Sequence, residues 1–325
     1  MNINLEKISE IIEIEYGIII HSIGQLNTGF DQNTFAYKII STNHKEYFLK
    51  IRSENFSESS LLIPLLIFDK TETSSIIKII KTIDNNLYAK YNSLYIAIYP
   101  FIKGQSGWEA SLTKNQFIEF GNFMHSLHSI QPQNNGYIPK EGFNQKYKES
   151  VKKYLNNCTH AINGNTEKFY FLDIFHKKKK VIMGILNFLD DITKEIDYKN
   201  LKMCLCHGDI HAGNILIAND NFYIVDWDTV IYAPKEKDLM FIGAGIGNKW
   251  NKNEEIDYFY DGYGKEIAID KVLIKYYRLE RIIQDIYEFY NQIMHTNIEE
   301  KEYELCIKYF LEQFENNNVV ENALK

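Results

Sequence analysis

Residues 205–216 read LCHGDIHAGNIL, and residues 223–228 read YIVDWD. The segments 215–218 and 222–225 are apolar and have the composition of β-strands. Residues 219–221, Asn-Asp-Asn, separate them, and these residue types favour tight turns because they tolerate a positive φ and hydrogen-bond to their own backbone. The pattern therefore predicts a β-hairpin.

Oxygen-bearing side chains surround the predicted hairpin. Because a hairpin returns the chain to its starting end, we expect Asn214 and Asp226 side by side at that end, with Asp209 just upstream. Amide and carboxylate oxygens are ligands of hard cations, so Asn214 and Asp226 are candidate ligands of Mg²⁺. The carboxylate of Asp209 is then free to handle a proton. Each residue alone could simply cap a turn, but the three together predict phosphoryl transfer from a nucleotide to a hydroxyl.

The composition is that of an ordinary globular protein. The chain has 325 residues, enough for two lobes with a core each, and 45% of the residues are hydrophobic while 24% are charged. Its net charge of −7 gives nucleic acid no overall electrostatic attraction and suits a cationic substrate. We therefore expect no nucleic-acid partner.

The chain carries no sequence signal for export or membrane insertion. Its four cysteines are too few and too scattered for a disulfide framework, which indicates a reducing compartment. The first residues lack the basic start and apolar core of a signal peptide. The longest apolar runs, such as Leu61–Phe68 with Pro64 inside it, are far shorter than a membrane span. We expect a cytoplasmic protein, a monomer or weak dimer, with no membrane partner.

Hydrophobic periodicity predicts an α+β protein with two lobes. The N-terminal part is expected to hold a small antiparallel sheet with strands at residues 17–20, 34–40, 47–51, 87–89 and 94–99, and helices at 5–15 and 57–68. Beyond Pro100, helical periodicity dominates, over residues 114–130, 151–158, 169–192 and 272–295. We therefore expect a nucleotide-binding lobe at residues 1–101 and a catalytic and substrate-binding lobe at residues 102–325.

The catalytic motif is similar to that of a known family. The sequence His207-Gly208-Asp209, with Asn214 and Asp226, resembles the catalytic and metal-binding loops of the protein-kinase-like fold. The likeness is to the small-molecule branch of that fold, the aminoglycoside phosphotransferases and choline kinases. It implies a two-lobed protein with a small antiparallel-sheet N-lobe and a mainly helical C-lobe.

Three later segments narrow the resemblance. Residues 233–243, 276–281 and 314–323 look like the spectinomycin phosphotransferases, and the likeness as a whole runs from about Leu5 to Ala323. It implies a nucleotide- and Mg²⁺-dependent enzyme that phosphorylates a hydroxyl of an aminocyclitol antibiotic, spectinomycin above all, and so confers resistance. ATP is the expected donor, with GTP left open because backbone groups would recognise the base.

The resemblance also implies which residues bind the nucleotide. Lys50, near the end of an expected strand, would contact the α- and β-phosphates. Its expected partner is Glu58, preferred over Glu54, although Pro64 lies inside the helix that Glu58 would begin. The remaining nucleotide-binding candidates are Thr28 and Gly29 in the phosphate-covering loop, and Tyr99, Phe101 and Ile102 in the hinge that binds the adenine edge.

The catalytic and acceptor roles follow from the same resemblance. Asp209 would orient the acceptor hydroxyl and take its proton late, whereas His207 is expected to tether the catalytic loop. Carboxylates and aromatic rings suit a protonated aminocyclitol, because they offer charge pairs and stacking surfaces. The candidate acceptor-binding residues are Trp227, Asp228, Asp285 and Tyr287.

Three other functions were weighed. A kinase of the same fold acting on choline, homoserine or an amino sugar stays open, as does a nucleotide-binding pseudokinase without activity. A protein kinase is disfavoured, because only seven residues separate Asp226 from Pro234, too few for an activation loop that docks a peptide. A zinc site is also disfavoured, since Cys204, Cys206 and the histidines that follow lack the usual ligand spacing.

Overall fold

The computed structural model of the chain describes residues 3–26, 34–53, 56–71, 73–130, 138–157, 166–296, 298–316 and 318–324. The chain forms two compact units. The first unit comprises Met1–Gln116, Gln133–Pro139 and Ala212–Ile231, and the second comprises Phe117–Pro132, Lys140–His211 and Tyr232–Lys325. Each unit is assembled from separate stretches of chain, whereas the expected lobes, residues 1–101 and 102–325, are continuous. That functional division stays a prediction.

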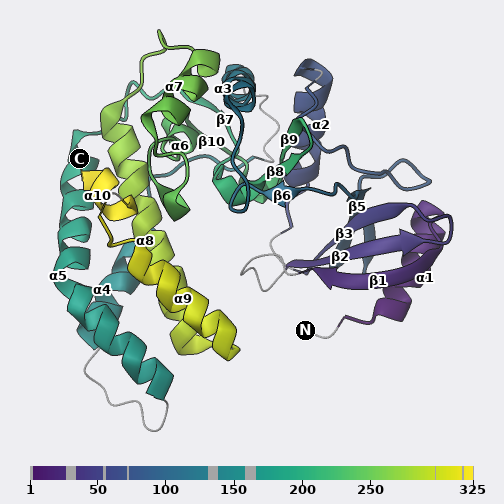
Figure 1. Cartoon of the computed structure of the whole chain (residues 1–325), viewed down its shortest axis with the longest axis horizontal. Coiled ribbons are helices and arrows are strands. Elements are labelled where there is room, and N and C mark those ends of the chain that lie inside the picture. The colour runs from purple at the N-terminus through teal and green to yellow at the C-terminus, as the bar shows by residue number, and fades with distance from the viewer. Residues whose placement is uncertain are drawn as a thin grey trace. The chain divides into compact units, whose positions relative to one another are not determined.

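A five-stranded antiparallel sheet dominates the first unit (Figure 1). Its strands are β1 (Ile20–Leu26), β2 (Thr34–Ser41), β3 (Glu46–Arg52), β5 (Leu94–Pro100) and β4 (Ala89–Tyr91), in that spatial order. The helix α1 (Leu5–Tyr16) precedes β1, and α2 (Ser59–Thr71) follows β3. The expected antiparallel sheet is thus confirmed. Strand β1 starts later than expected, because Gly17 ends α1 in left-handed backbone at φ 66°.

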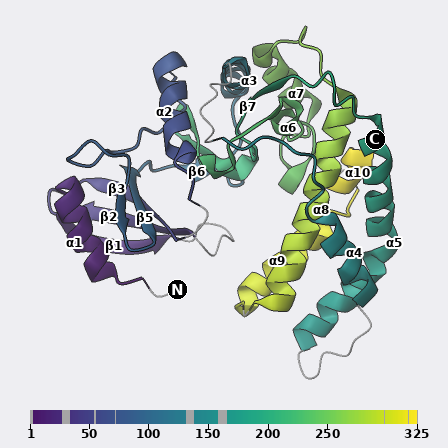
Figure 2. The same cartoon turned by 180° about the vertical axis from the view of Figure 1, so that it is seen from behind.

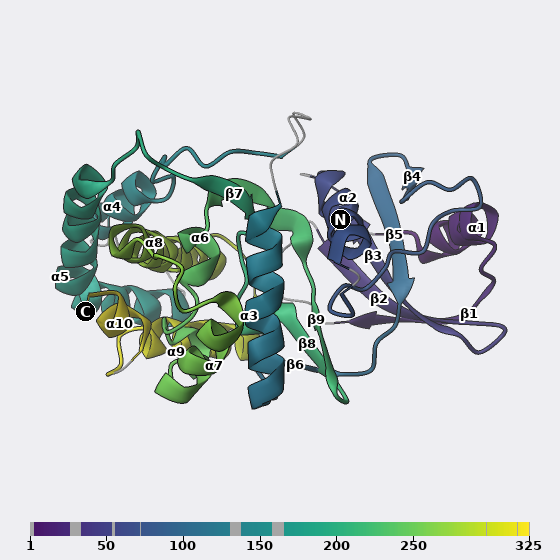
Figure 3. The same cartoon turned by 90° about the horizontal axis from the view of Figure 1, so that it is seen from above.

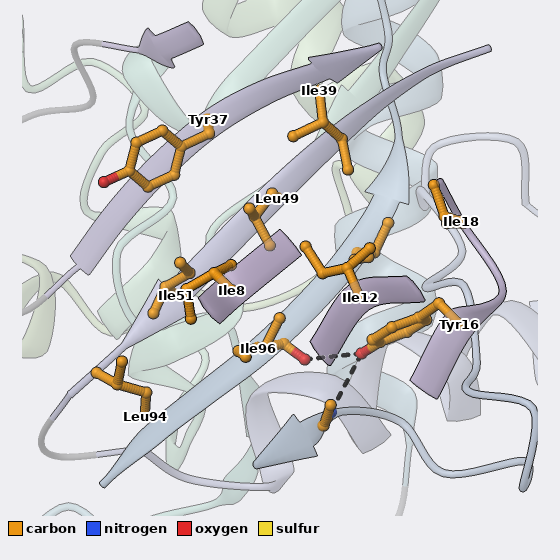
Figure 4. Packing of buried hydrophobic residues seen from close by; sticks show 12 residues of the cluster. Ile8, Ile12, Tyr16, Ile18, Tyr37, Ile39, Leu49, Ile51, Leu94 and Ile96 are labelled. Carbon is orange, nitrogen blue, oxygen red and sulfur yellow. Dashed lines mark hydrogen bonds between the residues drawn. The ribbon is translucent and has the colours of Figure 1, made fainter. Parts of the chain in front are cut away.

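The main core of the first unit lies between α1 and this sheet (Figure 4). Ile8 and Ile12 lie one helical turn apart on α1, and both are fully buried. Leu49 and Ile51 alternate along β3 and are fully buried as well. The helical period of α1 and the two-residue period of β3 thus each produce one apolar face, and these two faces pack against each other.

One side-chain oxygen ties α1 to two strands of the sheet. The hydroxyl of Tyr16 donates to the carbonyl of Ile96 on β5 at 2.7 Å and accepts from the amide of Ala89 on β4 at 3.2 Å. Ala89 and Ile96 are register partners, so the phenol oxygen bridges neighbouring strands (Figure 4). Burial raises the pKa of Tyr16 well above its usual value, so the hydroxyl keeps the proton that it donates.

A smaller sheet in the first unit contains the predicted hairpin (Figure 3). It consists of β6 (Gln105–Ser106), β8 (Ile215–Ala218) and β9 (Asn221–Ile224), in that order. Ala218 pairs with Asn221, so Asn219 and Asp220 form a two-residue turn, in which Asn219 has a φ of 53°. The hairpin is confirmed, and its turn has the positive φ that asparagine tolerates.

The second unit is mainly helical (Figures 1 and 2). Its helices are α3 (Lys114–Ser129), α4 (Lys148–Asn157), α5 (Thr166–Glu195), α6 (Glu236–Leu239), α7 (Asn253–Tyr263), α8 (Lys271–His295), α9 (Glu300–Glu312) and α10 (Val319–Leu324). Helix α8 packs against α4, α5, α6, α9 and α10. Two short strands, β7 (Met203–Cys206) and β10 (Ile231–Pro234), pair with each other, and the catalytic motif follows β7 in the sequence. The helices expected at residues 114–130, 169–192 and 272–295 are confirmed. Among the described residues, no helix combines the length and apolar character needed to cross a membrane.

Two glycines allow α3 and α7 to approach closely. A Cβ on Gly121 of α3 would lie 2.0 Å from the carbonyl oxygen of Phe259. A Cβ on Gly262 of α7 would lie 1.9 Å from the carbonyl oxygen of Ile118. The two helices therefore meet backbone to backbone, and a larger residue at either position would force them apart.

Candidate functional site

The catalytic motif is divided between the two units. Asp209 belongs to the second unit, whereas Asn214 and Asp226 belong to the first, and the chain passes from one to the other after His211. The candidate residues are therefore described as two groups, a nucleotide half and an acceptor half, each within one unit. The nucleotide half, in the first unit, contains the expected phosphate and metal residues. The acceptor half, in the second unit, contains the expected base.

Lys50 is the central cation of the nucleotide half. Its cross-strand neighbours are Ala36 on β2 and Ala97 on β5, whose small side chains leave room for the lysine stem. The Nζ atom donates to Oδ1 of Asp226 at 3.0 Å and to Oδ2 of Asp228 at 2.6 Å, and the Lys50 side chain is 16% exposed. Burial alone would lower the pKa of Lys50, but the two carboxylates outweigh it and raise the pKa. The lysine is therefore a charged ammonium held in place by two acids.

Arg52 is a second cation in the nucleotide half, and its role was not predicted. It follows Lys50 by two positions on β3, so both side chains share one face of the strand, and it forms an ion pair with Asp228. Burial raises the pKa of Asp228, while Lys50 and Arg52 oppose that rise. Asp228 was expected in the acceptor pocket. Here its carboxylate contacts the two cations, and its role toward an acceptor stays a prediction.

The expected pair between Lys50 and Glu58 is not formed among the described residues. Lys50 pairs with the two aspartates instead, and Glu58 lies just before α2, close enough to the Tyr88 hydroxyl to contribute to its raised pKa. The cause is the helix start: α2 begins at Ser59, so Glu58 precedes its first turn, and the helix then continues through Pro64. A role of Glu58 in nucleotide binding stays a prediction.

The expected hinge residues lie at the end of β5 and just beyond it, in the first unit. Tyr99 lies beside Lys50, and burial raises the pKa of the Tyr99 hydroxyl to about 12 although the ammonium opposes this. The backbone amide of Phe101 donates to the carbonyl of Glu46 at 3.2 Å, which ties this segment to β3. Ile102 comes next, with a partly exposed side chain. The expected loop residues Thr28 and Gly29 lie outside the described residues.

The two expected metal ligands lie at the open end of the hairpin. The carbonyl of Asn214 accepts from the amide of Val225 at 3.0 Å, so Asn214 and Asp226 are neighbours across the two strands. Asp226 has a φ of 62°, a left-handed backbone that is uncommon outside glycine and recurs at functional sites. Its side chain is 51% exposed. This pair of amide and carboxylate oxygens fits a hard cation such as Mg²⁺.

Trp227 is buried in the turn that follows Asp226. It begins a short 3₁₀ helix, η2 (Trp227–Thr229), against which α2 packs. Its indole Nε1 donates to the carbonyl of Ile224 at 3.1 Å. This placement favours a scaffolding role for Trp227 over the acceptor contact that was expected, which stays a prediction.

A buried aspartate holds the catalytic loop in the acceptor half. The carboxylate of Asp238 accepts from the amides of His207 at 2.8 Å and Gly208 at 2.7 Å. It also lies 3.1 Å from Nε2 of His128, whose other ring nitrogen lies 2.9 Å from the hydroxyl of Tyr263. Burial raises the pKa of Asp238, but the hydrogen bond and charge of His128 outweigh this effect and the pKa is lowered, so Asp238 is an anion. Asp238 therefore fixes the backbone of His207 and Gly208, the two residues that precede the expected base Asp209.

Asp209 lies beside Arg281, a partly buried arginine of α8. Its Oδ1 accepts from Nη1 of Arg281, and Nε of Arg281 donates to Oδ1 of Asp285 at 2.7 Å. Burial raises the pKa of Asp209, but the charge of Arg281 outweighs this and the pKa is lowered. For Asp285 burial prevails and raises the pKa to about 6, with the like charge of Glu288 acting in the same direction. Arg281 was not predicted as a site residue, although the spacing of four from Asp285 on a helix was the available signal.

Tyr287 belongs to an aromatic cluster between α8 and the α4 region. Its ring centroid lies 4.8 Å from that of Tyr147 and 5.9 Å from that of Tyr154. Tyr154 also stacks on Tyr290 at 3.9 Å. Tyr287 follows Asp285 by two positions on α8, so the two side chains leave the helix in different directions. A role of Tyr287 toward an acceptor stays a prediction.

One group of three soft ligands occurs among the described residues. The ligand atoms of His128, Cys204 and Cys206 lie within 4.8 Å of one another. Both nitrogens of His128 already have partners, and both sulfurs contact the carbonyl of Ala233, at 3.4 and 3.6 Å. The ligand atoms of these three side chains therefore already have partners within the protein, and the group is explained as part of the packing around the catalytic loop.

Solved structures of two nucleotide complexes of one enzyme resemble this chain over nearly its full length. The spectinomycin phosphotransferase APH(9)-Ia in complex with ADP and spectinomycin is 34% identical, with a TM-score of 0.90, over 98% of this chain and 97% of that one. Its AMP-bound complex is also 34% identical, with a TM-score of 0.87, over 98% of each chain. The amicoumacin kinase hAmiN, at 12% identity and a TM-score of 0.65 over 95% of this chain and 93% of that one, shares the fold.

The comparison of sequences agrees with that of structures. A family model described as the phosphotransferase enzyme family matches residues 25–272. No curated protein sequence matches the chain. The protein-kinase-like α+β fold, with an antiparallel sheet in its N-terminal region and helices in its C-terminal region, is thus confirmed.

Proposed function

The chain belongs to the phosphotransferase enzyme family, and on that basis we propose that it transfers the γ-phosphoryl group of a nucleotide to a hydroxyl of spectinomycin or a closely related aminocyclitol. The observation that carries the proposal is the 34% identity, over 98% of the chain, to a spectinomycin phosphotransferase solved with ADP and spectinomycin. The partly buried cations of β3, Lys50 and Arg52, and the ionised carboxylate of Asp209 support it.

The nucleotide half supplies the groups that a donor requires. Lys50 would exchange one of its carboxylate partners for donor phosphate, and Arg52 lies on the same face of β3. Asn214 and Asp226 would hold Mg²⁺, which neutralises charge on phosphate oxygens when it is bound. ATP is the proposed donor, with GTP as the alternative.

The acceptor half supplies a carboxylate that is ionised before the acceptor arrives. Arg281 lowers the pKa of Asp209, so this group is a weak base at neutral pH. A weak base suffices if the proton leaves the hydroxyl late, because phosphoryl transfer has a loose transition state in most analyses. Asp209 would therefore act first by orienting the hydroxyl and only then by accepting its proton.

Acidic and aromatic side chains of α8 suit a protonated aminocyclitol. The carboxylate of Asp285 would attract an ammonium group, and the partly buried ring of Tyr287 would stack on a sugar face. Phosphorylation would add a dianion to the antibiotic and spoil ribosome binding through charge and bulk, which would confer resistance. We propose a cytoplasmic enzyme that is a monomer or weak dimer.

The proposal is tested by a coupled assay of ADP release with Mg-ATP. The acceptors are spectinomycin, kanamycin, choline and homoserine, with Mg-GTP as a second donor. We expect turnover with spectinomycin and none with choline or homoserine. Turnover only with another acceptor would move the proposal to that substrate class. Nucleotide binding without turnover on any acceptor would favour a pseudokinase.

Resistance is tested separately, in a susceptible bacterial host. Expression of the wild-type chain should raise the spectinomycin concentration that the host tolerates, whereas the Asp209→Asn variant at equal expression should not. Equal tolerance in both would show that the phosphotransfer is not the cause.

A further inference from the structure

Two cations of β3 meet at one carboxylate oxygen in the first unit. Lys50 and Arg52 are two positions apart on the strand, so both side chains leave the same face of the sheet. Nζ of Lys50 donates to Oδ2 of Asp228 at 2.6 Å, and Nη1 of Arg52 forms an ion pair with the same oxygen. Asp228 therefore joins the side chain of Lys50 to that of a second residue of the strand.

The two carboxylates that contact Lys50 are held differently. Asp228 is 19% exposed, contacts both cations, and belongs to η2, against which α2 packs. Asp226 is 51% exposed and is also a candidate ligand of Mg²⁺. Solvent screens an exposed ion pair more than a shielded one. Asp226 is therefore the partner that Lys50 would release to donor phosphate, and Asp228 is the partner that it would retain.

The acid expected to hold Lys50 from the neighbouring helix does not do so. Helix α2 begins at Ser59, after Glu58, and Glu58 forms no ion pair with any residue in the described part of the chain. Within the described residues, the acids that contact the ammonium of Lys50 come from the turn after β9. Asp228 thus makes the contact that was expected of Glu58.

We propose that Asp228, anchored by Arg52, is the residue that positions Lys50 for the donor phosphates. The inference rests on the proposed function, in which Lys50 binds the donor. An ammonium sits on a flexible stem, so its place depends on its partner, whereas the planar guanidinium of Arg52 can hold a carboxylate in a fixed direction. The position of Lys50 is therefore determined by the turn that follows β9, instead of by an acid of α2.

Two other roles of Asp228 predict different results. If Asp228 bound the acceptor, its loss would raise the KM for spectinomycin and leave the Kd for ADP unchanged. If it only stabilised the fold, its loss would lower the melting temperature, and the folded protein would keep its kinetic constants. A positioning role predicts a higher Kd for ADP and a lower kcat/KM for Mg-ATP, with an unchanged KM for spectinomycin.

The test compares Asp228→Asn, Arg52→Gln and the double variant with the wild-type chain. Calorimetric titration gives the Kd for ADP, steady-state assays with Mg-ATP and spectinomycin give kcat and both KM values, and thermal melting shows whether each variant is folded. Asp173→Asn is the matched control, because Asp173 also pairs with a lysine, Lys177 at 2.7 Å, but on an exposed part of α5. Asp228→Asn leaves two shielded cations without this partner, so the double variant, with one cation fewer, replaces it if it does not fold.

We expect Asp228→Asn to lower kcat/KM for Mg-ATP about 10²-fold and to raise the Kd for ADP, because a misplacement of about 1 Å can cost about 10²-fold in rate. Arg52→Gln should cause a smaller loss of the same kind. It should have no further effect in the Asp228→Asn protein, since a residue that acts through another adds nothing once the other is gone. Asp173→Asn should match the wild type.

Three results would overturn the proposal. Tighter ADP binding by Asp228→Asn would make Asp228 a competitor of the phosphates. A greater loss of ADP affinity in Glu58→Gln than in Asp228→Asn would return the positioning role to the acid before α2. Losses from Asp228→Asn and Arg52→Gln that add in the double variant would show that Arg52 does not act through Asp228.

Failure of the proposed function itself would look different. In that case the wild-type chain would bind ADP but show no turnover with spectinomycin, whereas failure of the inference leaves wild-type turnover intact. The Kd for ADP needs no acceptor, so it still decides the role of Asp228. Equal Kd values for the wild type and the folded Asp228→Asn variant would reject the positioning role.

Discussion

Two carboxylates on either side of one guanidinium have pKa values that move in opposite directions. Asp209 shares Arg281 with Asp285, but Asp285 also faces the like charge of Glu288 from one turn further along α8. A buried acid that is paired with a cation ionises easily, whereas one beside another acid does not. The pKa of Asp209 is therefore lowered, whereas burial and the neighbouring Glu288 raise the pKa of Asp285 to about 6.

Replacement of Asp209 tests the base directly. We expect Asp209→Asn to lower kcat with spectinomycin by about 10²–10⁴, the usual range for the loss of a general base. The Kd for ADP should not change, because the donor residues belong to the first unit. A steady-state assay of ADP release gives kcat, and calorimetric titration with ADP gives the Kd. A variant with wild-type turnover would remove Asp209 from this role.

The raised pKa of Asp285 predicts how acceptor binding depends on pH. Above its pKa of about 6 the group is an anion that attracts an ammonium, and below that value it is neutral. The KM for spectinomycin should therefore rise as the pH falls through about 6, while the KM for Mg-ATP should not follow it. Asp285→Asn should give a high KM that is flat over the same interval. A wild-type KM without this inflection would mean that Asp285 does not bind the acceptor.

At the scale of the elements, the contact between α3 and α7 depends on having no side chain at two positions. Gly121→Ala would place a methyl group 2.0 Å from the carbonyl oxygen of Phe259, so the helices must separate. We expect a loss of about 1–3 kcal/mol in the free energy of unfolding, the usual cost of overpacking.

At a second helical glycine, Gly184, replacement by alanine is expected to change the free energy of unfolding in the opposite direction. Gly184 lies within α5. A Cβ at this position would have no atom within 4 Å other than those of its chain neighbours and its own helix backbone. Gly184→Ala should therefore raise the free energy of unfolding by about 0.5–1 kcal/mol, because alanine loses less backbone entropy in a helix. Urea unfolding of both variants measures the two changes. Similar destabilisation of both would show that steric contact is not what distinguishes Gly121.

The elements that could be predicted from the sequence are those whose causes are local. The hairpin depends on two apolar runs and a turn of Asn219 and Asp220, all within about a dozen residues. The capped helix α3 is another case, because Thr113 and Gln116 exchange hydrogen bonds across its first turn. Strand β1 was placed too early because the hydrophobic pattern does not reveal that Gly17 takes a left-handed backbone.

The contacts that could not be predicted join residues far apart in the chain. Arg281 and Asp209 are 72 positions apart, and Lys50 and Asp228 are 178 apart. Periodicity tells which side chains share a face, but not which face of another element they will meet. The family resemblance pointed to Glu58 as the partner of Lys50, whereas the structure pairs that lysine with Asp226 and Asp228, which follow the hairpin.

At the scale of the whole molecule, the net charge of −7 predicts a salt effect that differs between the substrates. An anionic protein attracts a cationic acceptor and repels Mg-ATP over long range, and salt screens both effects. Between about 0.01 M and about 0.15 M salt the Debye length falls from about 30 Å to about 8 Å. The kcat/KM for spectinomycin should decline over this range, and that for Mg-ATP should hold or rise. A parallel decline for both would point to a local rather than a global cause.

The phenol oxygen of Tyr16 has a consequence for how such an enzyme could be disabled. It hydrogen-bonds to the carbonyl of Ile96 and to the amide of Ala89 at once, so α1 is tied directly to the sheet that carries Lys50. A compound that occupied the place of Tyr16 between these strands would leave two buried polar groups without partners and weaken the sheet itself. On the proposed function, a molecule of this kind would disable the enzyme without competing with ATP or the antibiotic, because it would act on the protein while it folds.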